Sequence, residues 1–152
     1  MNVEFSVASD FDSWISLARE VEHLFGPMAD DRSFQGALKQ AISDGVAFCI
    51  RSEGANPQHL MGGVVISKES NEIVWLAVSN RYRAKGNGKK LLSFAMEQLD
   101  IDKTAYVQTF NDTVSEGLPA RKLYTKFGFN DHEDGGLNPA GIPTVIMRRL
   151  RF

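Results

Sequence analysis

Glycines and basic residues combine in one short segment of the chain, Arg83-Ala84-Lys85-Gly86-Asn87-Gly88. It follows a run rich in β-branched and aromatic residues, 73–78, and precedes a stretch with apolar residues at helical spacing, 91–99. A glycine-containing turn that opens a helix presents unpaired backbone N–H groups and the positive end of the helix dipole. The segment therefore predicts an anion site suited to phosphate groups, with a tight turn that binds no ligand as the alternative.

The segment does not match two better-known phosphate-binding loops. A Walker loop has the pattern G-x-x-x-x-G-K-[ST], but here Arg83 takes the place of the first glycine and Lys90 the place of the hydroxyl residue. A Rossmann loop needs a third glycine at a place that holds Leu91. A nucleotide-binding α/β domain stays open only as a remote alternative.

The pattern that fits is [QR]-x-x-G-x-[GA], with Arg83, Gly86 and Gly88 in its fixed places. This pattern is the acetyl-CoA pyrophosphate loop of the GNAT superfamily of N-acetyltransferases, which the chain resembles. A second segment, residues 120–129, has the sequence ARKLYTKFGF and resembles the A-x-x-L-Y-x-x-x-G-F segment of the same superfamily. The two motifs occur in the superfamily's order.

The resemblance implies an α/β, GNAT-like fold with a central, mixed, mostly antiparallel sheet flanked by about four helices. It also implies acetyl-CoA as cosubstrate. At 152 residues the chain is expected to form a single N-acetyltransferase domain over residues 1–152, because no linker divides it.

By this resemblance, backbone N–H groups of the loop bind the pyrophosphate, and the pantetheine arm lies along the end of the preceding strand. The residues so implied in cofactor binding are Ala77, Val78, Arg83, Lys85, Gly86, Asn87, Gly88 and Lys89. A Cβ at either loop glycine would hold phosphate oxygens away from the amides or force a strained φ. The superfamily frequently carries Asn seven residues before the motif tyrosine; here that residue is Gly117, and Asn111 or Ser115 is the candidate substitute.

Tyr124, the tyrosine of the second motif, is the candidate acid that protonates the departing thiolate. A free phenol has a pKa of about 10 and a thiol about 8.5, so the phenol is protonated at neutral pH. The alternative is a tyrosine that only packs against the helix face.

Glu72 is the candidate general base. It begins the segment Glu72-Ile73-Val74-Trp75-Leu76-Ala77-Val78-Ser79, which resembles the E-I-V-x-x-A-[IV]-S strand of lysine acetyltransferases. Alternation places Glu72, Val74 and Leu76 on one face of a strand, where burial would raise the carboxyl pKa. The alternatives are a solvated turn residue here and a chain of water molecules as the base.

The segment between the first two expected helices, residues 22–28, lies where the superfamily builds part of its acceptor pocket. His23, Phe25 and Met28 are the candidate lining residues, with a core-and-turn role as the alternative. Nearby acids would favour a cationic acceptor, although such charges more often solvate a surface. These acids are Glu20, Glu22, Asp30 and Asp31.

Composition excludes several classes of function. The net charge of −2 gives no basic surface for nucleic acid or an anionic membrane. Cys49 is the single cysteine, so there is no internal disulfide or multi-cysteine zinc site, and no His, Cys and acid spacing indicates a metal. No signal pattern or long apolar run is present, so the expected location is the cytoplasm. The oligomeric state stays open, with a homodimer as one form.

Periodicity and turn residues outline the remaining elements. Strands are expected at residues 3–7, 46–51, 60–67, 72–79, 104–110 and 143–150, with one more after Gly128. Helices are expected after Asp10 or Asp12, over 34–42, after the glycine loop and before Gly128. Residues 54–57 read as a turn, and residues 131–136 as a loop.

The predicted function is therefore transfer of an acetyl group from acetyl-CoA to a primary amine by direct attack in a ternary complex. We favour a small-molecule acceptor. The alternatives are a protein lysine or N-terminal acetyltransferase and a non-catalytic acyl-CoA-binding sensor. Acetyl-CoA binding without turnover would identify the sensor, and preferential binding of ATP or NAD would identify a nucleotide-binding domain.

Overall fold

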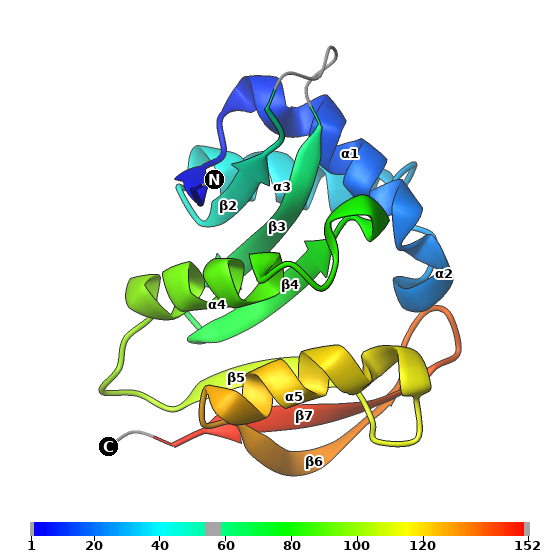
Figure 1. Ribbon diagram of the computed structural model, residues 1–152, viewed down its shortest axis with the longest axis vertical. Helices are drawn as coiled ribbons and strands as arrows, with labels where there is room; N and C mark the ends of the chain where they lie inside the picture. The colour runs from blue at the N-terminus through cyan, green and yellow to red at the C-terminus, as the bar shows by residue number, and fades with distance from the viewer. Residues whose placement is uncertain (1, 54–58, 151–152) are drawn as a thin grey trace.

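The computed structural model describes residues 2–53 and 59–150, and its centre is a seven-stranded sheet in the order β1-β2-β3-β4-β5-β7-β6 (Figure 1). Neighbouring strands are antiparallel except for β4 and β5, which run parallel. The strands are β1 (Glu4–Phe5), β2 (Ala47–Arg51), β3 (Leu60–Ser67), β4 (Glu72–Val78), β5 (Ala105–Phe110), β6 (Asn130–Leu137) and β7 (Pro143–Arg149). This mixed, mostly antiparallel α/β architecture is the fold that the sequence predicts.

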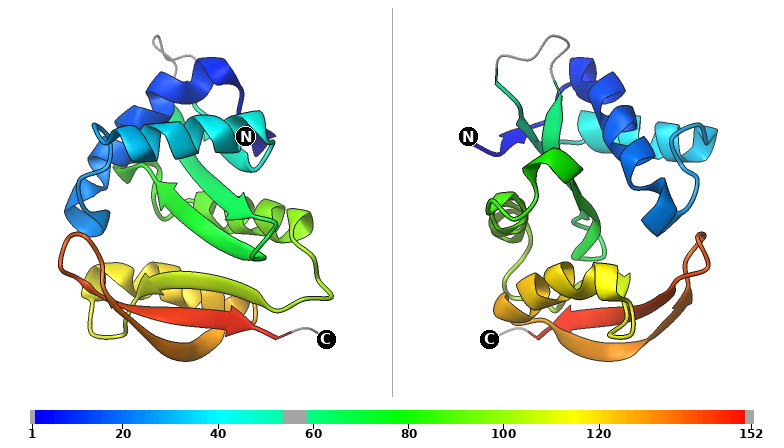
Figure 2. Two further views of the ribbon diagram at one scale, coloured as in Figure 1. Left: turned by 180° about the vertical axis from the view of Figure 1, so that it is seen from behind. Right: turned by 45° about the vertical axis from the view of Figure 1, so that its right-hand side comes forward.

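Helices cover both faces of the sheet. They are α1 (Phe11–Glu20), α2 (Glu22–Phe25), α3 (Arg32–Ser43), α4 (Asn87–Gln98) and α5 (Leu118–Lys126), with short 3-10 turns η1 (Ala8–Asp10), η2 (Asn80–Tyr82) and η3 (Ser115–Gly117). Helices α1 and α3 lie on one face of the N-terminal strands, and α4 and α5 lie on the opposite face (Figures 1 and 2). Strand β3 is therefore covered on both faces, as its apolar composition requires, whereas β4 and β5 each keep one exposed residue.

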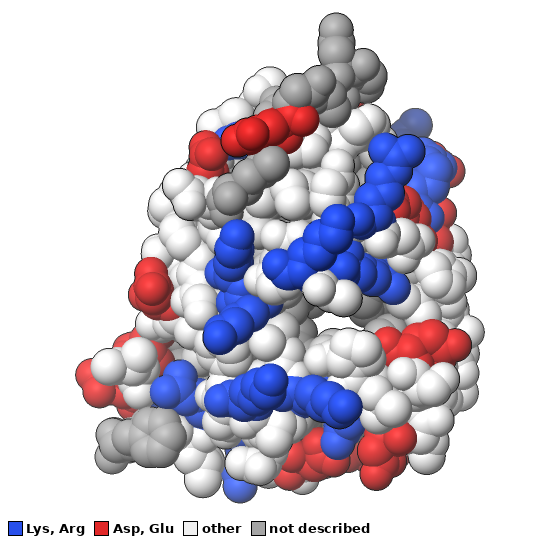
Figure 3. All heavy atoms as spheres, viewed as in Figure 1, with Lys and Arg blue, Asp and Glu red and all other residues white. Residues whose placement is uncertain are grey.

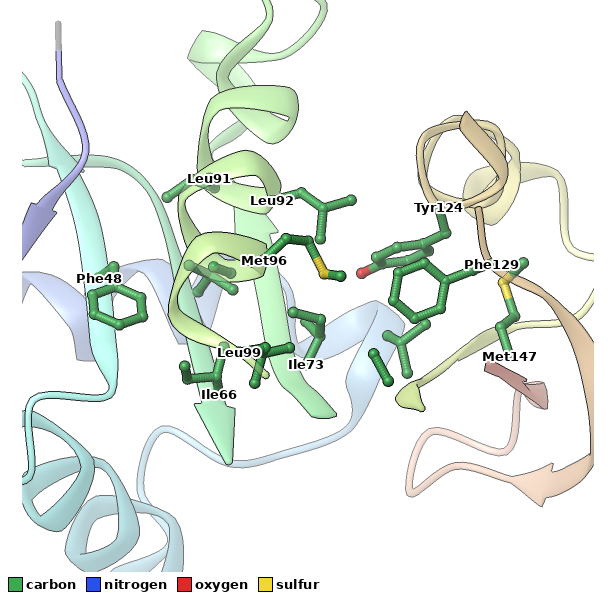
Figure 4. Close-up of a cluster of buried hydrophobic side chains, with 14 of the residues drawn as sticks. Phe48, Ile66, Ile73, Leu91, Leu92, Met96, Leu99, Tyr124, Phe129 and Met147 are labelled. Carbon is green, nitrogen blue, oxygen red and sulfur yellow. The ribbon is translucent and has the colours of Figure 1, made fainter. Parts of the chain in front are cut away.

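Each face has its own hydrophobic core. On the α4 side, apolar residues of α4 pack against β2, β3, β4 and the α5–β6 region, and Figure 4 shows Leu92, Met96 and Tyr124 meeting there. On the other side, Trp14 of α1 packs directly on Gly63 of β3, where a Cβ would lie 2.4 Å from the indole ring. This glycine therefore permits the close approach of α1 to the sheet.

Strands β4 and β5 divide the sheet into two halves. They pair only at Glu72 with Tyr106 and at Ile73 with Val107, and then they separate. Beyond that point β4 stays paired with β3, while β5 pairs along its whole length with β7. The sheet thus opens between its halves after the first two residues of β4 (Figure 1).

A β-bulge changes the expected orientation of side chains along β4. The register with β3 shifts at Val74, between the pairs Val65–Trp75 and Ile66–Ile73. As a result Ile73 and Leu76 both contact the α4-side core, although strict alternation would place them on opposite faces. The expectation that Glu72, Val74 and Leu76 share one face is therefore wrong, because one extra residue reverses the alternation.

A second sequence expectation is also wrong. Residues 131–136 were expected to form a loop because they are polar and rich in glycine, but they belong to the edge strand β6. All but one of its residues are exposed, so the strand needs no apolar face, and charges at a sheet edge discourage pairing with other chains. The expected turn at residues 54–57 lies outside the described residues. Among the helices that are described, none is long and apolar enough to cross a membrane.

Candidate active site

A cavity of about 720 Å³ lies where β4 and β5 diverge. Its walls come from α1, α2, α3, β4, β5, α5 and the β6–β7 loop. The residues of the two diverging strands that line it are Ile73, Val74, Trp75 and Leu76 on β4 and Val107, Gln108, Thr109 and Phe110 on β5. A concave, largely apolar site with a few polar groups is the usual form of a small-molecule site.

The glycine loop forms the start of α4, as its sequence predicts. Gly86 is the N-cap residue with a left-handed φ of +83°, and Lys90 N–H donates to the Gly86 carbonyl. The N–H groups of Asn87, Gly88 and Lys89 precede this first helical bond and therefore have no carbonyl one turn earlier in the helix. The buried Asn87 side chain donates to the Tyr82 carbonyl at 2.9 Å, which closes the loop from within.

The two loop glycines have different physical roles. Gly86 needs its positive φ, and a Cβ there would meet no atom within 4 Å. Gly88 has no such requirement; a Cβ there would touch Leu123 of α5 at 3.4 Å and Val78 of β4 at 3.8 Å. Gly88 therefore lies between the two halves of the sheet, where any side chain would reduce the space beside the helix start.

Positive charge gathers around this loop although the whole chain carries a net charge of −2. Figure 3 shows Lys and Arg side chains over the loop region and along α5, with a hollow between them. Arg83, Lys85 and Lys89 are exposed at the loop, and Lys122 and Lys126 are exposed on α5. Free amide donors, a helix N-terminus and basic side chains on both sides of a hollow can hold a polyanion.

Ala77 and Val78 lie at the end of β4, beyond its pairing with β5. On one side both residues pair with β3, at Gly63 and Gly62. Arg83 Nε donates to the Val78 carbonyl at 3.2 Å, which holds the arginine across the loop. Arg83, expected at the pyrophosphate of acetyl-CoA, and Val78, expected at its pantetheine arm, are thus neighbours in the structure.

Tyr124 lines the cavity and is 4% exposed. It extends from α5 into the α4-side core, where its ring meets Phe129 edge to face at 5.9 Å (Figure 4). Burial raises the pKa of the Tyr124 phenol well above its ordinary value. The hydroxyl is therefore a hydrogen-bond donor throughout the neutral range.

Glu72 is located away from these groups. It is half-buried at the start of β4, and its carboxylate accepts a hydrogen bond from Ser70 Oγ at 2.7 Å. Within the described part of the chain it is not among the residues that line the cavity. The role of Glu72 as a base stays a prediction.

Aromatic side chains form one part of the cavity lining. Phe25 of α2, Trp75 of β4 and Phe110 of β5 form what we call the aromatic wall: the Phe25 ring stacks on Phe110 at 5.4 Å and lies 6.1 Å from Trp75. Trp75 Nε1 is buried and has no hydrogen-bond partner among the described residues. Met28 also lines the cavity as expected, whereas His23 is exposed on α2 and does not.

The acids near α2 in the sequence have other partners. Glu22 accepts from the Met28 and Ala29 N–H groups at 2.7 and 3.1 Å, and Asp30 pairs with Arg19 at 3.1 Å. Glu20 accepts from Ser79 Oγ at 3.1 Å, outside the cavity. Asp31 alone of the four acids lines the cavity, and it caps α3 by accepting from Ser33 N–H at 3.1 Å.

A contact between distant segments joins the two halves of the molecule beside the cavity. Asn138 Nδ2 of the β6–β7 loop donates to the Leu24 carbonyl of α2 at 2.8 Å. The next residue, Pro139, packs on Gly26 so closely that a Cβ there would lie 2.6 Å from Pro139 Cβ. We call these residues, Leu24, Gly26, Asn138 and Pro139, the clasp; Figure 2 shows α2 and the β6–β7 loop side by side. Only the tertiary contact reveals this role of Asn138 and Pro139.

The departure from the superfamily pattern at Gly117 has a steric cause. A Cβ at this buried glycine would lie 2.5 Å from Phe110 Cβ, so no side chain fits. The candidate substitutes are bonded locally: Asn111 Oδ1 accepts from Thr113 N–H at 2.9 Å, and Ser115 Oγ donates to Glu116 at 3.4 Å. In the part of the chain that the structure describes, no group of three or more His, Cys, Asp or Glu residues could hold a metal ion.

Comparison with known proteins identifies this architecture. The family model described as the acetyltransferase (GNAT) domain matches residues 44–131, more than half of the chain. That span includes the glycine loop, β4, β5 and Tyr124. No curated protein matches the chain in sequence.

Three solved structures illustrate the likeness in fold. The PaiA N-acetyltransferase of Thermoplasma acidophilum, in complex with coenzyme A, is 16% identical with a TM-score of 0.69, covering 98% of both chains. The ribosomal-protein-S18-alanine N-acetyltransferase of Escherichia coli is 16% identical with a TM-score of 0.72, covering 99% of this chain and 94% of its own. A chain of the NatC complex bound to Gag peptide and CoA is 16% identical with a TM-score of 0.72, covering 100% of both. At this identity the likeness concerns the fold alone.

Proposed function

Because the chain belongs to the GNAT acetyltransferase family, we propose that it transfers the acetyl group of acetyl-CoA to the nitrogen of a small primary amine. The observation that carries this proposal is the opening between β4 and β5: the aromatic wall lines the cavity there, and the basic helix start, which is outside the cavity lining, lies next to Val78 at the end of β4. Two of the similar structures contain CoA, which supports the same cosubstrate here. The chain is proposed to act as a single domain in the cytoplasm; a homodimer stays open.

The start of α4 fits the pyrophosphate of acetyl-CoA. The N–H groups from Lys85 to Lys89 would bind its oxygens, and Arg83, Lys85 and Lys89 would balance its charge. The backbone of Ala77 and Val78 would bind the pantetheine arm beside the open edge of β4. Gly88 leaves room for this arm between α4 and α5, since it has no Cβ to contact Leu123.

The reaction joins the amine nitrogen to the acetyl carbon and breaks the bond from that carbon to sulfur. Acetyl-CoA supplies the activated carbonyl group and the thiolate that leaves. Tyr124 would donate a hydrogen bond to that thiolate; because burial raises its pKa, we favour stabilisation by this bond over full loss of the phenolic proton. A backbone N–H near Leu76 to Val78 would stabilise the negative charge on the carbonyl oxygen.

Direct attack by the amine is favoured over a covalent enzyme intermediate. Cys49 is fully buried in β2 outside the cavity, and burial raises the pKa of its thiol, which makes it a poor nucleophile. The proton of the attacking amine would pass to Glu72 through water, or to water alone. The choice between these two routes is tested below.

Calorimetric titration with acetyl-CoA, CoA, ATP and NAD tests the proposal. We expect micromolar or tighter binding of acetyl-CoA and CoA, with ATP and NAD much weaker. No binding of CoA would contradict the proposal. Binding of acetyl-CoA with no acetylation of any amine would instead indicate the acyl-CoA sensor that the sequence leaves open.

A further inference from the structure

A second cavity lies outside the site described above. Its volume is about 260 Å³, against about 720 Å³ for the cavity between β4 and β5, and no described residue lines both. Its walls come from α1, the start of β3 and the η2 turn, which lies between β4 and the glycine loop; Figure 1 shows this turn beside α1. We call it the η2 cavity. Its size limits an occupant to a small molecule.

The η2 cavity has charged groups of both signs. Glu20 of α1 and Arg81 of η2 line it, and both side chains are exposed. The ion pairs found among the described residues do not include a pair between these two. Opposite charges that line one cavity without pairing suit a ligand that bears both charges, because each can then form a charge-assisted hydrogen bond.

The Glu20 carboxylate is positioned by the turn opposite α1. Its Oε1 atom accepts from Ser79 Oγ at 3.1 Å and from the Asn80 N–H at 3.4 Å. Ser79 is buried, so these bonds hold the carboxylate at the cavity wall. Within the described residues both bonds go to Oε1, which leaves Oε2 for a further donor. An ammonium group, with three N–H donors, suits that oxygen.

The rest of the lining combines apolar and polar groups. Leu17 and Leu60 line the cavity and are 1% and 3% exposed. Ser16, Tyr82 and His59 add two hydroxyl groups and an imidazole to the lining. Buried leucines provide contact for a short aliphatic group, and the polar groups fix its orientation. The lining thus suits a small molecule with one ammonium group, one carboxylate and a short side chain.

Tyr82 connects the η2 cavity to the start of α4. Tyr82 lines the cavity, and its backbone carbonyl accepts the hydrogen bond from the buried Asn87 side chain at 2.9 Å. The Tyr82 N–H donates to the Ser79 carbonyl at 2.9 Å, so η2 links the contact of Glu20 to the glycine loop. A ligand that stabilises η2 would therefore also stabilise the loop proposed to bind pyrophosphate. By thermodynamic reciprocity, each ligand would raise the affinity for the other.

We propose that the η2 cavity is a regulatory site for a small free α-amino acid, and that its occupation raises the affinity for acetyl-CoA. The ammonium group binds Glu20, and the carboxylate binds Arg81. No covalent bond forms or breaks, and the amino acid is not the acetyl acceptor. The coupling rests on the cofactor site proposed above, whereas the binding of the amino acid does not.

Calorimetric titration with glycine, L-alanine and L-serine, in the absence of CoA, tests the site. L-Alaninamide, which lacks the carboxylate, and N-acetyl-L-alanine, which lacks the ammonium group, are the comparison ligands. We expect a Kd of about 0.1–1 mM for L-alanine and at least about tenfold weaker binding of both derivatives, since each leaves one charge of the cavity unpaired. Equal binding of N-acetyl-L-alanine would overturn the proposal in favour of a simple anion site. Failure of all three amino acids to bind would overturn the site itself.

Two substitutions locate the bound amino acid. Glu20→Gln removes the negative charge and keeps an oxygen that can accept from Ser79, and Arg81→Gln removes the positive charge at an exposed position. Each should weaken L-alanine binding about 10-fold to 100-fold. Arg32→Gln is the control, since Arg32 is exposed on α3 and lines neither cavity. Affinity that is unchanged in both variants would show that L-alanine binds elsewhere and would overturn the assignment.

The coupling is measured by titrating CoA with and without saturating L-alanine. We expect the Kd of CoA to fall about fivefold, and Arg81→Gln should lose this shift. An unchanged Kd would overturn the regulatory role.

Mass spectrometry after incubation with acetyl-CoA should show unmodified L-alanine. Acetylation of L-alanine that Arg81→Gln does not affect would place the amino acid in the cavity between β4 and β5 and would overturn the second site. A protein that binds L-alanine but no CoA would contradict the acetyltransferase and the coupling, while the amino-acid site would stand.

Discussion

The two parts of the proposed site are built in different ways. The start of α4 is made by consecutive residues, and its chemistry comes from backbone N–H groups and basic side chains. The aromatic wall combines residues 25, 75 and 110 from three elements, and its chemistry comes from side-chain shape. A site made of consecutive residues can be recognised as a motif in the sequence, whereas a site made of residues from separate elements cannot. Changes in the first part should affect acetyl-CoA affinity, and changes in the second should affect the acceptor.

The largest effect is expected for Gly88→Val at the start of α4. The new side chain would enter the space between α4 and α5 next to Leu123, and it would separate the amides from the pyrophosphate. We expect acetyl-CoA affinity to fall by about 2–4 kcal/mol, roughly 30-fold to 1,000-fold in Kd. Calorimetry measures this change.

The control for that substitution is another glycine. Gly36 lies in α3, a Cβ there meets nothing within 4 Å, and it does not line the cavity. Gly36→Ala should leave the Kd unchanged and stabilise the fold by about 0.5–1 kcal/mol. An unchanged Kd in Gly88→Val would show that the start of α4 does not bind the cofactor.

Tyr124→Phe should separate the chemical step from binding. The ring still packs on Phe129, so acetyl-CoA affinity should change little while kcat falls about 10-fold to 100-fold. Burial raises the Tyr124 pKa above its ordinary value of 10.0, so the phenol stays protonated at any pH below 10.0. Ionisation of Tyr124 should therefore cause no decline in kcat below that pH. Steady-state kinetics against pH measure both. An unaltered kcat would remove Tyr124 from the mechanism; Tyr106→Phe, outside the cavity, is the control.

A smaller effect is expected when the clasp is opened. Asn138→Ala removes the hydrogen bond to the Leu24 carbonyl and leaves the start of α4 untouched. The KM of the acceptor should rise about threefold to tenfold, the cost of about one hydrogen bond, with acetyl-CoA affinity constant. If acetyl-CoA affinity fell equally, the two parts of the site would not be independent.

The smallest effect is expected for Glu72→Gln. Glu72 is half-buried, bonded to Ser70 and outside the cavity lining. We expect kcat/KM to change by less than about threefold, and its rise with pH to follow the pKa of the amine used. A flattened alkaline rise would identify Glu72 as the general base that the sequence indicates. The measurement is kcat/KM against pH for the unchanged protein and for Glu72→Gln, with amines of different pKa as acceptors.

Much of the fold was predictable because its signals are local. Strands β3 and β4 and the start of α4 occur where the sequence places them, since alternation, helical spacing and glycine turns act over a few residues. The polar strand β6 was not predictable in this way. It is stable because β7 pairs with it at the sheet edge, and an edge strand exposed on both faces carries no apolar pattern.

The sequence by itself determined the family, the helix start at Gly86 and the place of Tyr124 on α5, because each depends on residues close together in the chain. Tertiary structure alone decided which side chains line the cavity. The bulge at Val74 reversed the alternation that would have placed Glu72 with Leu76. The separation of β4 from β5 opened the cavity, and the clasp brought residues 24 and 138 together. Such contacts depend on strand register and on packing between distant segments, which local sequence patterns do not encode.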